Sequence, residues 1–313
     1  MADNRCLSVP AATRRIIDVK KPCDDNVAQR FIRIGDMLDA RKFVFSGMAM
    51  IFNRLHQNKN LQKAVFNAIR LNRPEVADAI LDDDLKFIGY CLSRRDWSRA
   101  QILQDLWVCY ESYENRDGFF VEFGSTNGLK NSNTWLLEKQ FGWSGILAEP
   151  NPIWHPELAA NRNASIDHRC VSSQSHNTVN FIATDDVDPE LSSIADFSQG
   201  DHFSEVRQKG RQIQVETISL DDLLETYHAP PVVDYLSIDT EGSELDILSA
   251  FSFDRKFDLI SVENNPKTEA AIQKLLENKG YRRVFEQFSQ WDGWYASARL
   301  RDGRKREVVA PAS

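Results

Sequence analysis

The chain has 313 residues, a length that accommodates about two domains. Hydrophobic residues make up 42% of it and charged residues 27%, which excludes collagen-like, low-complexity and wholly disordered classes. With 38 Lys and Arg against 46 Asp and Glu, the net charge of −8 has the wrong sign for a protein that neutralises nucleic-acid phosphates. We therefore expect a folded protein that has no nucleic-acid partner.

The cysteines and the apolar runs bear on the cellular compartment. The five cysteines are scattered and form no C-x-x-C pair, which argues against a disulfide framework and against a structural zinc site. The opening segment lacks the apolar stretch of an export signal. The longest nearly apolar run, Phe43–Phe52, is far shorter than the roughly 18 residues of a membrane helix. We expect a cytoplasmic protein without a membrane span.

The first third of the chain carries a helical pattern. Residues 1–25 show no periodicity and are expected to form a flexible tail. Apolar residues then recur at helical spacing, which predicts a helical N-terminal domain at 26–116 that selects substrate or partner, or forms a homodimer. Residues 301–313 are expected to form a charged C-terminal tail.

From residue 117 to 300 short β-rich runs alternate with helical runs, which predicts a parallel sheet wrapped by helices. The strands are expected at Phe119–Phe123, Gly145–Glu149, Ile166–Val171, Val233–Asp239 and Phe257–Glu263. The helices are expected at Asn133–Phe141, Pro152–Asn161, Leu220–Tyr227, Ser243–Phe251 and Thr268–Lys279, the last ended by Gly280. Residues 185–212 lack an apolar period and are interpreted as a substrate-side insertion.

The last two β-rich runs, Arg282–Phe288 and Trp291–Ala298, are separated only by a tight turn, so they should form an antiparallel hairpin. An NAD-type Rossmann sheet is parallel throughout, whereas the Rossmann-like sheet of class I S-adenosylmethionine methyltransferases ends in a reversed strand. The hairpin therefore favours an α/β fold of the class I methyltransferase type.

Two strand ends predict a nucleoside cofactor. Gly124 and Gly128 follow the first strand, where they let the backbone turn tightly against an anionic group at a helix N-terminus. Glu149 ends the second strand, where its carboxylate is placed to accept hydrogen bonds from both hydroxyls of a ribose. The alternatives are a plain strand-to-helix turn and a surface glutamate before a helix. On these residues alone, NAD and S-adenosylmethionine both fit.

A second group of polar residues follows the next two strands. Asp239 ends one strand, and Glu263 and Asn264 end the other, so all three should converge on the ligand crevice. Their oxygens suit a hard divalent cation such as Mg²⁺. The alternative is a set of helix caps and turn residues, including a capping box of Ser243 with Asp246.

From about Ser98 onward the chain resembles the FkbM family of S-adenosylmethionine-dependent methyltransferases. The resemblance rests on Gln104-Asp105-Leu106, Phe120 to Gly124, Ser132-Asn133-Thr134, Leu137-Glu138-Lys139, Gly142 to Ile146, Glu149 to Pro152, Thr217 to Leu223 and Asp239 to Glu244. Together these motifs are far more specific than a single glycine pair. The sequence departs from the family at Glu263-Asn264-Asn265, where the family often has Glu-His-Asn, so no histidine base is present there.

The resemblance implies transfer of a methyl group from S-adenosylmethionine to a hydroxyl of a sugar, a glycan or a polyketide-like small molecule. The residues expected to bind the cofactor are Glu122, Gly124, Ser125, Asn127, Gly128, Ser132, Asn133, Thr134, Glu149, Pro150, Asn151, Val171 and Asp239. Asp239 is the expected catalytic base with Glu241 in reserve, unless Asp239, Glu263 and Asn264 hold Mg²⁺.

Two other functions share parts of this pattern. An NAD-dependent sugar oxidoreductase would use the glycine loop and Glu149, but the Tyr-x-x-x-Lys proton relay is absent from the sequence. A non-catalytic module could retain the fold and use the helical part for protein contacts. The complete set of Glu122, Gly124, Gly128 and Glu149 favours the methyltransferase over both.

Overall fold

A computed structural model describes residues 58–60, 63, 83–184, 192–197 and 210–301 of the chain. The chain divides into two units, Met1–Asn72 and Arg73–Ser313, and every element below belongs to the second. The predicted tail at 1–25, nearly all of the predicted helical domain before residue 83 and residues 302–313 of the charged tail lie outside the described residues. The domain boundaries, and a homodimer through residues 26–116, stay predictions.

A seven-stranded sheet forms the centre of this unit, in the order β10-β11-β9-β8-β1-β2-β3. Its strands are β1 (Phe119–Phe123), β2 (Ser144–Ala148), β3 (Ser165–Asp167), β8 (Val232–Ile238), β9 (Lys256–Glu263), β10 (Tyr281–Arg283) and β11 (Asp292–Ser297). The first five run parallel, whereas β11 runs antiparallel to both β9 and β10. The expected α/β fold and its terminal antiparallel hairpin are confirmed.

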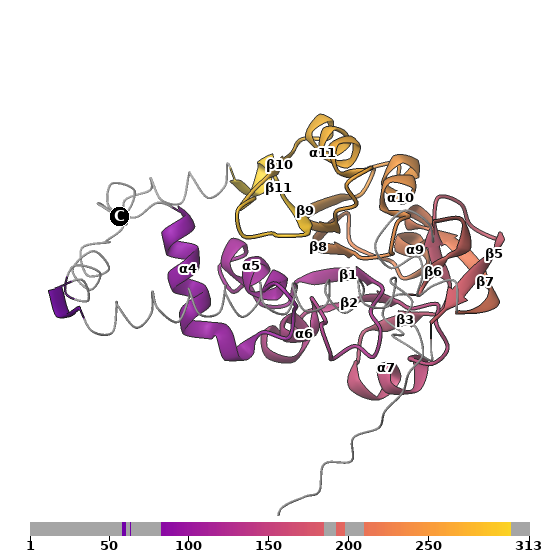
Figure 1. Ribbon diagram of the computed structural model, residues 1–313, viewed down its shortest axis with the longest axis horizontal. Helices are drawn as coiled ribbons and strands as arrows, with labels where there is room; N and C mark the ends of the chain where they lie inside the picture. The colour runs from indigo at the N-terminus through magenta and orange to yellow at the C-terminus, as the bar shows by residue number, and fades with distance from the viewer. Residues whose placement is uncertain (1–57, 61–62, 64–82, 185–191, 198–209, 302–313) are drawn as a thin grey trace, which may run out of the picture. The chain divides into compact units, whose positions relative to one another are not determined.

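Helices cover both faces of this sheet (Figure 1). One hydrophobic cluster joins it to α5 (Gln104–Glu111), α6 (Trp135–Phe141) and α7 (His155–Asn161), and the other joins it to α9 (Leu220–Thr226), α10 (Glu244–Ala250) and α11 (Glu269–Asn278). Phe120 belongs to the first cluster, and Val121 and Phe123 to the second, because successive side chains of a strand point to opposite faces. Helices thus separate both faces from water, as the apolar strand sequences require.

The segment that precedes β1 is part of the same core. Helix α4 (Asp83–Arg94), with the short 3₁₀ helix η1 (Arg95–Trp97) after it, packs against α5, and Phe87 is buried in the α5–α7 cluster. The hydroxyl of Tyr110 donates to the carboxylate of Asp83 across 2.6 Å. Arg301, at the end of the described chain, pairs with Asp83 and with the buried Glu111.

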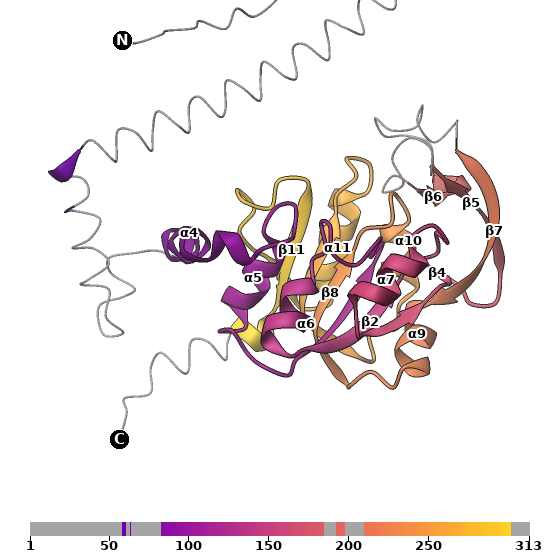
Figure 2. The same cartoon turned by 90° about the horizontal axis from the view of Figure 1, so that it is seen from below.

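A second, four-stranded sheet was not predicted. It contains β4 (Cys170–Ser172), β5 (Thr178–Ala183), β6 (Ser193–Ile194) and β7 (Arg211–Ser219), in the order β4-β7-β5-β6, with the 3₁₀ helix η3 (Ala195–Phe197) after β6. Figure 2 shows β5, β6 and β7 at the end of the unit farthest from α4. Parts of the predicted insertion at 185–212 are therefore strands, and its residues 185–191 and 198–209 lie outside the described residues.

The single strand expected at Ile166–Val171 is wrong. Strand β3 pairs with β2 in the large sheet, whereas β4 pairs with β7 in the small one. Between them the carboxylate of Asp167 accepts the backbone N–H of Arg169 across 2.8 Å and binds its guanidinium group. A side chain that binds the backbone two residues later makes a local turn, and this turn ends the strand.

The strand expected at Arg282–Phe288 is wrong in its extent, because β10 ends at Arg283 and residues 284–291, not a tight turn, connect it to β11. The remaining expected helices and strands are confirmed to within a few residues. Helix α11 ends as predicted, because Gly280 follows it with the left-handed φ of +90°. Within the described part of the chain, none of the helices combines the length and the apolar character that crossing a membrane requires.

Candidate functional site

The loop after β1 lies against the end of β8. Gly124 has φ +67°, and a Cβ atom built there would lie 2.2 Å from the backbone oxygen of Asp239. Gly128 has φ +73°, and its Cβ would lie 2.5 Å from Cγ of Arg162. Both positions therefore require glycine, for conformation and for space. The predicted tight turn is present, and it brings the ends of β1 and β8 together.

Glu149, just beyond β2, is tied to this loop. One of its carboxylate oxygens accepts the backbone N–H of Thr126, and the other accepts that of Asn151, each across 2.8 Å. The residue is only 4% exposed. Burial, with a smaller contribution from the charge of Asp239, outweighs these hydrogen bonds and raises the pKa of Glu149 to about 7. The carboxyl group therefore changes its charge near neutral pH.

A cleft opens between these strand ends. Six predicted site residues line it, namely Gly124, Glu149, Pro150, Val171, Asp239 and Glu241. The others in its wall are Phe123, Thr126, Ala148, Cys170, Phe181, Ser192, Ile194 and Thr240. We call this cleft the first pocket.

Sequence reasoning missed the part of the first pocket that the small sheet supplies. Phe181 lies on β5, whose β-branched and apolar residues were an overlooked strand signal. Ser192 and Ile194 lie in the segment interpreted as an aperiodic insertion, where no signal was present. This segment also reaches the loop after β8, since a Cβ at Gly242 would lie 3.2 Å from Phe197.

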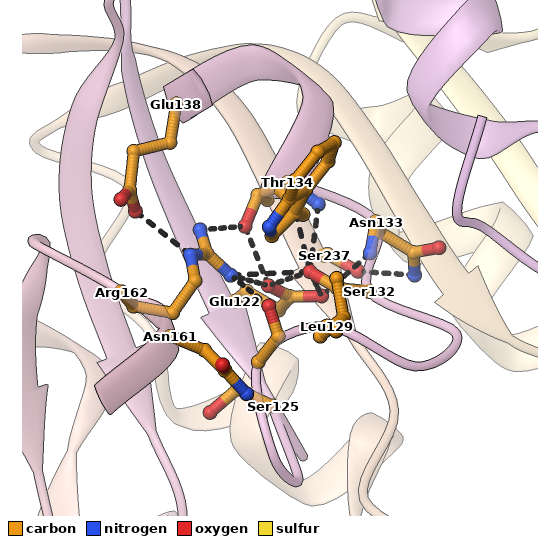
Figure 3. A network of polar contacts seen from close by, with 12 residues as sticks. Glu122, Ser125, Leu129, Ser132, Asn133, Thr134, Glu138, Asn161, Arg162 and Ser237 are labelled. Carbon is orange, nitrogen blue, oxygen red and sulfur yellow. Dashed lines mark hydrogen bonds and ion pairs between the residues drawn. The ribbon is translucent and has the colours of Figure 1, made fainter. Parts of the chain in front are cut away.

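Three predicted cofactor residues are engaged in a buried polar network away from the first pocket (Figure 3). Glu122 accepts hydrogen bonds from Thr134 Oγ1 at 2.5 Å and from the hydroxyl of Ser132. Arg162, whose side chain is fully buried, binds Glu138 at 2.8 Å and lies 3.6 Å from Glu122. The network fixes the turn before α6, which explains why this helix begins at Trp135 and not at Asn133.

The remaining predicted residues near the loops hold backbone in place. Ser125 is buried, and its hydroxyl donates to the backbone oxygen of Ala148 across 3.3 Å. The side-chain oxygen of Asn127 accepts the N–H groups of the next turn. Asn151 donates to the hydroxyl of Ser192 across 3.2 Å, which links the end of β2 to the small sheet. Direct contact of these residues with a cofactor stays a prediction.

Three carboxylates gather at the ends of β8 and β9. Oxygens of Asp239, Glu241 and Glu263 lie within 4.8 Å of one another. Burial, together with the charges of Asp239 and Glu241, raises the pKa of Glu263 well above its ordinary value. Two of the predicted metal ligands, Asp239 and Glu263, are thus neighbours, and Glu241 joins them. Asn264 follows Glu263 directly, and its role as a ligand stays a prediction.

The alternative of a capping box is wrong. Ser243 caps α10 without a hydrogen bond from its side chain to the helix backbone. Instead, the carboxylate of Glu244 accepts the N–H groups of Thr240, at 3.1 Å, and Gly242, at 2.9 Å. The glutamate therefore holds the loop that carries Glu241, which has a left-handed φ of +58°.

Asp239 also lines a second pocket. Its wall consists of Gln101, Gln104, Asn131, Asn133, Ile238, Asp239, Trp291 and Asp292. Asp292 is 5% exposed. Its burial, together with the negative charge of Asp239, raises its pKa to about 8. Asp239 is common to both pockets, so a group bound in one lies close to a group bound in the other.

Comparison with known proteins identifies the family. Residues 119–283 match the sequence model of the Methyltransferase FkbM domain. The chain belongs to the FkbM methyltransferase family. The match covers all the parallel strands of the large sheet, from β1 to β9, and the small sheet that contributes to the first pocket. It ends at β10, so the FkbM domain match excludes α4, α5 and β11.

Other comparisons add little to the FkbM assignment. No curated protein matches the sequence. Among solved structures, the chain resembles that of precorrin-6y C5,15-methyltransferase from Geobacter metallireducens GS-15, with a TM-score of 0.33 and 11% identity. The alignment covers 61% of this chain and 84% of that chain. A likeness at this level carries no argument about the substrate.

Proposed function

We propose that this FkbM protein is an S-adenosylmethionine-dependent O-methyltransferase acting on a hydroxyl of a sugar, a glycan or a polyketide-like molecule. The observation that carries the proposal is Glu149, a buried carboxylate in the wall of the first pocket, tied to the glycine loop after β1. A carboxylate at this point of an α/β sheet accepts both hydroxyls of a ribose. The strand order, with its reversed β11, supports a class I Rossmann-like methyltransferase sheet.

The residues of the first pocket fit such a cofactor. Each carboxylate oxygen of Glu149 accepts one backbone N–H, which leaves a second lone pair on each for a ribose hydroxyl. Val171, Phe181 and Ile194 form an apolar wall suited to a purine ring. Gly124 lets the ligand approach the backbone closely, because no side chain fills the turn.

S-adenosylmethionine, when bound, supplies an electrophilic methyl group on a positively charged sulfur. The protein has to hold the acceptor oxygen about 3 to 3.5 Å from that carbon and in line with the sulfur. The protein also has to remove the proton of the acceptor hydroxyl. Asp239 is placed to do this, because its side chain is exposed and lines both pockets. Glu241 is the reserve base.

In the alternative form of the proposal, Asp239, Glu263 and Asn264 hold a Mg²⁺ ion. The chemistry that such an ion supplies is a lowered pKa of the acceptor hydroxyl. Oxygen donors are the right kind for Mg²⁺, and the closeness of Asp239, Glu241 and Glu263 is compatible with a shared cation. A bound cation would also relieve the mutual repulsion of the three carboxylates.

Calorimetric titration of the full-length protein with S-adenosylhomocysteine, and in parallel with NAD, tests the proposal. We expect one-to-one micromolar binding of S-adenosylhomocysteine and no binding of NAD. Binding of NAD alone would contradict the methyltransferase cofactor and favour the oxidoreductase. If neither ligand bound, the interaction module would be favoured instead. A positive result justifies a screen of hydroxylated acceptors with and without Mg²⁺.

A further inference from the structure

One wall of the second pocket comes from the segment before β1, and hydrogen bonds fix the backbone of that segment. The buried carboxylate of Asp105 accepts the hydroxyl of Ser98 at 2.6 Å and the N–H of Arg99 at 2.9 Å, which fixes the turn that leads into α5. A β-bridge joins Ala100 to Asn131 across this turn. The backbone that carries Gln101, and the side chains of Gln104 and Asn133, are therefore held in place before any ligand arrives.

A buried acceptor atom in this wall has no partner. Asn133 is about nine-tenths buried, its side-chain nitrogen donates to Ser237 across 2.9 Å, and its backbone N–H donates to Glu122. Its Oδ1 atom has no hydrogen-bond partner among the residues that the structure describes. A buried oxygen of this kind costs free energy unless a donor reaches it, and Asn133 is one of the residues that line the second pocket.

The opposite wall comes from β11 and the residue before it. Gln104 donates to the carboxyl group of Asp292 across 3.0 Å, so these two side chains are positioned by each other. Trp291 is 49% exposed at the rim, and its backbone oxygen is held by the N–H of Asn264 at 2.8 Å. An exposed indole beside a polar cleft offers a flat apolar face to the C–H side of a ring.

We propose that the second pocket is the acceptor subsite, and that Asn133, Gln104 and Trp291 there bind a neutral, polyhydroxylated ring. The inference rests on the proposed function. Four amide side chains line the pocket, and each offers donors and an acceptor, which matches hydroxyl groups because these also do both. Among the described residues the lining contains carboxylates and no Lys or Arg, so a phosphorylated or carboxylated ring would be repelled.

Ligand-observed NMR on the full chain tests the subsite. The protein is first saturated with S-adenosylhomocysteine, and the probes are the methyl glycosides of glucose, galactose, mannose, xylose and rhamnose, with myo-inositol. We expect saturable binding of at least one probe. The 6-phosphate counterpart of the best hexose probe should bind at least about tenfold more weakly, because the described residues of the pocket lining offer its negative charge no Lys or Arg.

Variants assign the binding to the residues. Asn133→Ala and Trp291→Ala should each weaken binding of the best probe by about fivefold to tenfold, the equivalent of one lost hydrogen bond or ring contact. Trp97→Ala is the matched control, because Trp97 is also partly exposed, at 36%, but lies on η1 outside the pocket. Trp291→Ala removes an exposed side chain, so it remains informative if the buried Asn133→Ala variant fails to fold.

The outcomes separate the subsite from the cofactor proposal. If S-adenosylhomocysteine binds but no neutral probe does, the subsite is wrong and the proposed function stands. If a probe binds equally well to both pocket variants, or the phosphate counterpart binds more tightly, the subsite is also wrong. If S-adenosylhomocysteine itself does not bind, the proposed function fails and the subsite fails with it.

Discussion

The carboxylate of Glu149 accepts the backbone N–H of Thr126 across 2.8 Å, although the two residues follow different strands. The hydrogen bond makes the acidic end of β2 and the glycine loop after β1 one rigid unit. The same carboxylate accepts the N–H of Asn151, so it is oriented from two sides. Such preorganisation reduces the entropy that a bound ribose would otherwise cost.

Replacing Glu149 with glutamine should weaken S-adenosylhomocysteine binding by about 1.5 to 3 kcal/mol, because a hydrogen bond to a charged group is lost. The amide nitrogen of the new glutamine would also face the backbone N–H of Thr126 or Asn151, and it could not accept a hydrogen bond from that group. Calorimetric titration measures the change. Glu277→Gln is the matched control, since Glu277 is an exposed glutamate on α11 outside the first pocket. Equal affinity of wild type and Glu149→Gln would remove Glu149 from the ribose site.

Cofactor affinity should depend on pH near neutrality. Ribose hydroxyls stabilise the ionised carboxylate, so binding lowers the pKa of Glu149 from the value of about 7 that burial imposes on the free protein. Affinity for S-adenosylhomocysteine should therefore rise from pH 6 through pH 7 and level off above it. Calorimetry at several pH values follows this rise. The contribution of Glu149 should be missing in Glu149→Gln, and a rise of the same size in that variant would assign the pH dependence to another group.

The elements that sequence reasoning located correctly are those whose signal is local. Strands such as β1 and β9 are apolar on both faces, and helices such as α11 end at a glycine, so the residues themselves report the structure. The antiparallel pairing of β10 with β11 followed from two β-rich runs with no helical run between them. These features depend little on distant parts of the chain.

The features that escaped prediction depend on tertiary contacts. The family resemblance suggested that Glu122 binds the cofactor, yet its partner Arg162 follows α7, far along the sequence, and no local pattern pairs the two residues. The split between β3 and β4 depends on which sheet each strand joins. The wall that Ile194 contributes to the first pocket comes from a two-residue strand, too short to leave a periodic signal.

Gly124→Ala should abolish or strongly weaken S-adenosylhomocysteine binding. The new methyl group would lie 2.2 Å from the backbone oxygen of Asp239, and alanine disfavours the φ of +67°. The loop after β1 must therefore move away from β8. Gly89→Ala is the control, because a Cβ at Gly89 meets nothing within 4 Å in helix α4, where alanine is the better helix former. Calorimetry and thermal unfolding of both variants measure binding and stability, and tight binding by Gly124→Ala would contradict the assignment of the loop.

Arg162→Met should destabilise the protein by about 3 to 5 kcal/mol, because it leaves the buried carboxylate of Glu122 without its positive partner. Unfolding by urea, followed through the tryptophan near-ultraviolet signal, measures the loss. Arg255→Met is the comparison, since the partner of Arg255, Glu225, has a side chain that is 72% exposed, and its loss should change stability far less. Similar effects of the two substitutions would show that the network around Glu122 contributes no more than a surface ion pair.

Asp239→Asn should separate catalysis from cofactor binding. The asparagine keeps the size of the side chain but cannot take up a proton, so methyl transfer should fall by about 100- to 10,000-fold while S-adenosylhomocysteine affinity changes little. Transfer of a labelled methyl group to a neutral polyol that binds the second pocket is the activity measurement, and calorimetry is the binding measurement. Equal losses in both would make Asp239 a cofactor-binding residue, and a larger activity loss in Glu241→Gln would transfer the role of base to Glu241.

Chelation decides between the base and the metal forms of the mechanism. If Asp239, Glu263 and Asn264 hold Mg²⁺, dialysis against EDTA should abolish methyl transfer, and added Mg²⁺ should restore it to the wild type but not to Glu263→Gln. Full activity after exhaustive chelation would contradict the metal site and leave Asp239 as a base acting alone. In that case the raised pKa of Glu263, which burial and its acidic neighbours cause, would serve to limit the negative charge beside Asp239.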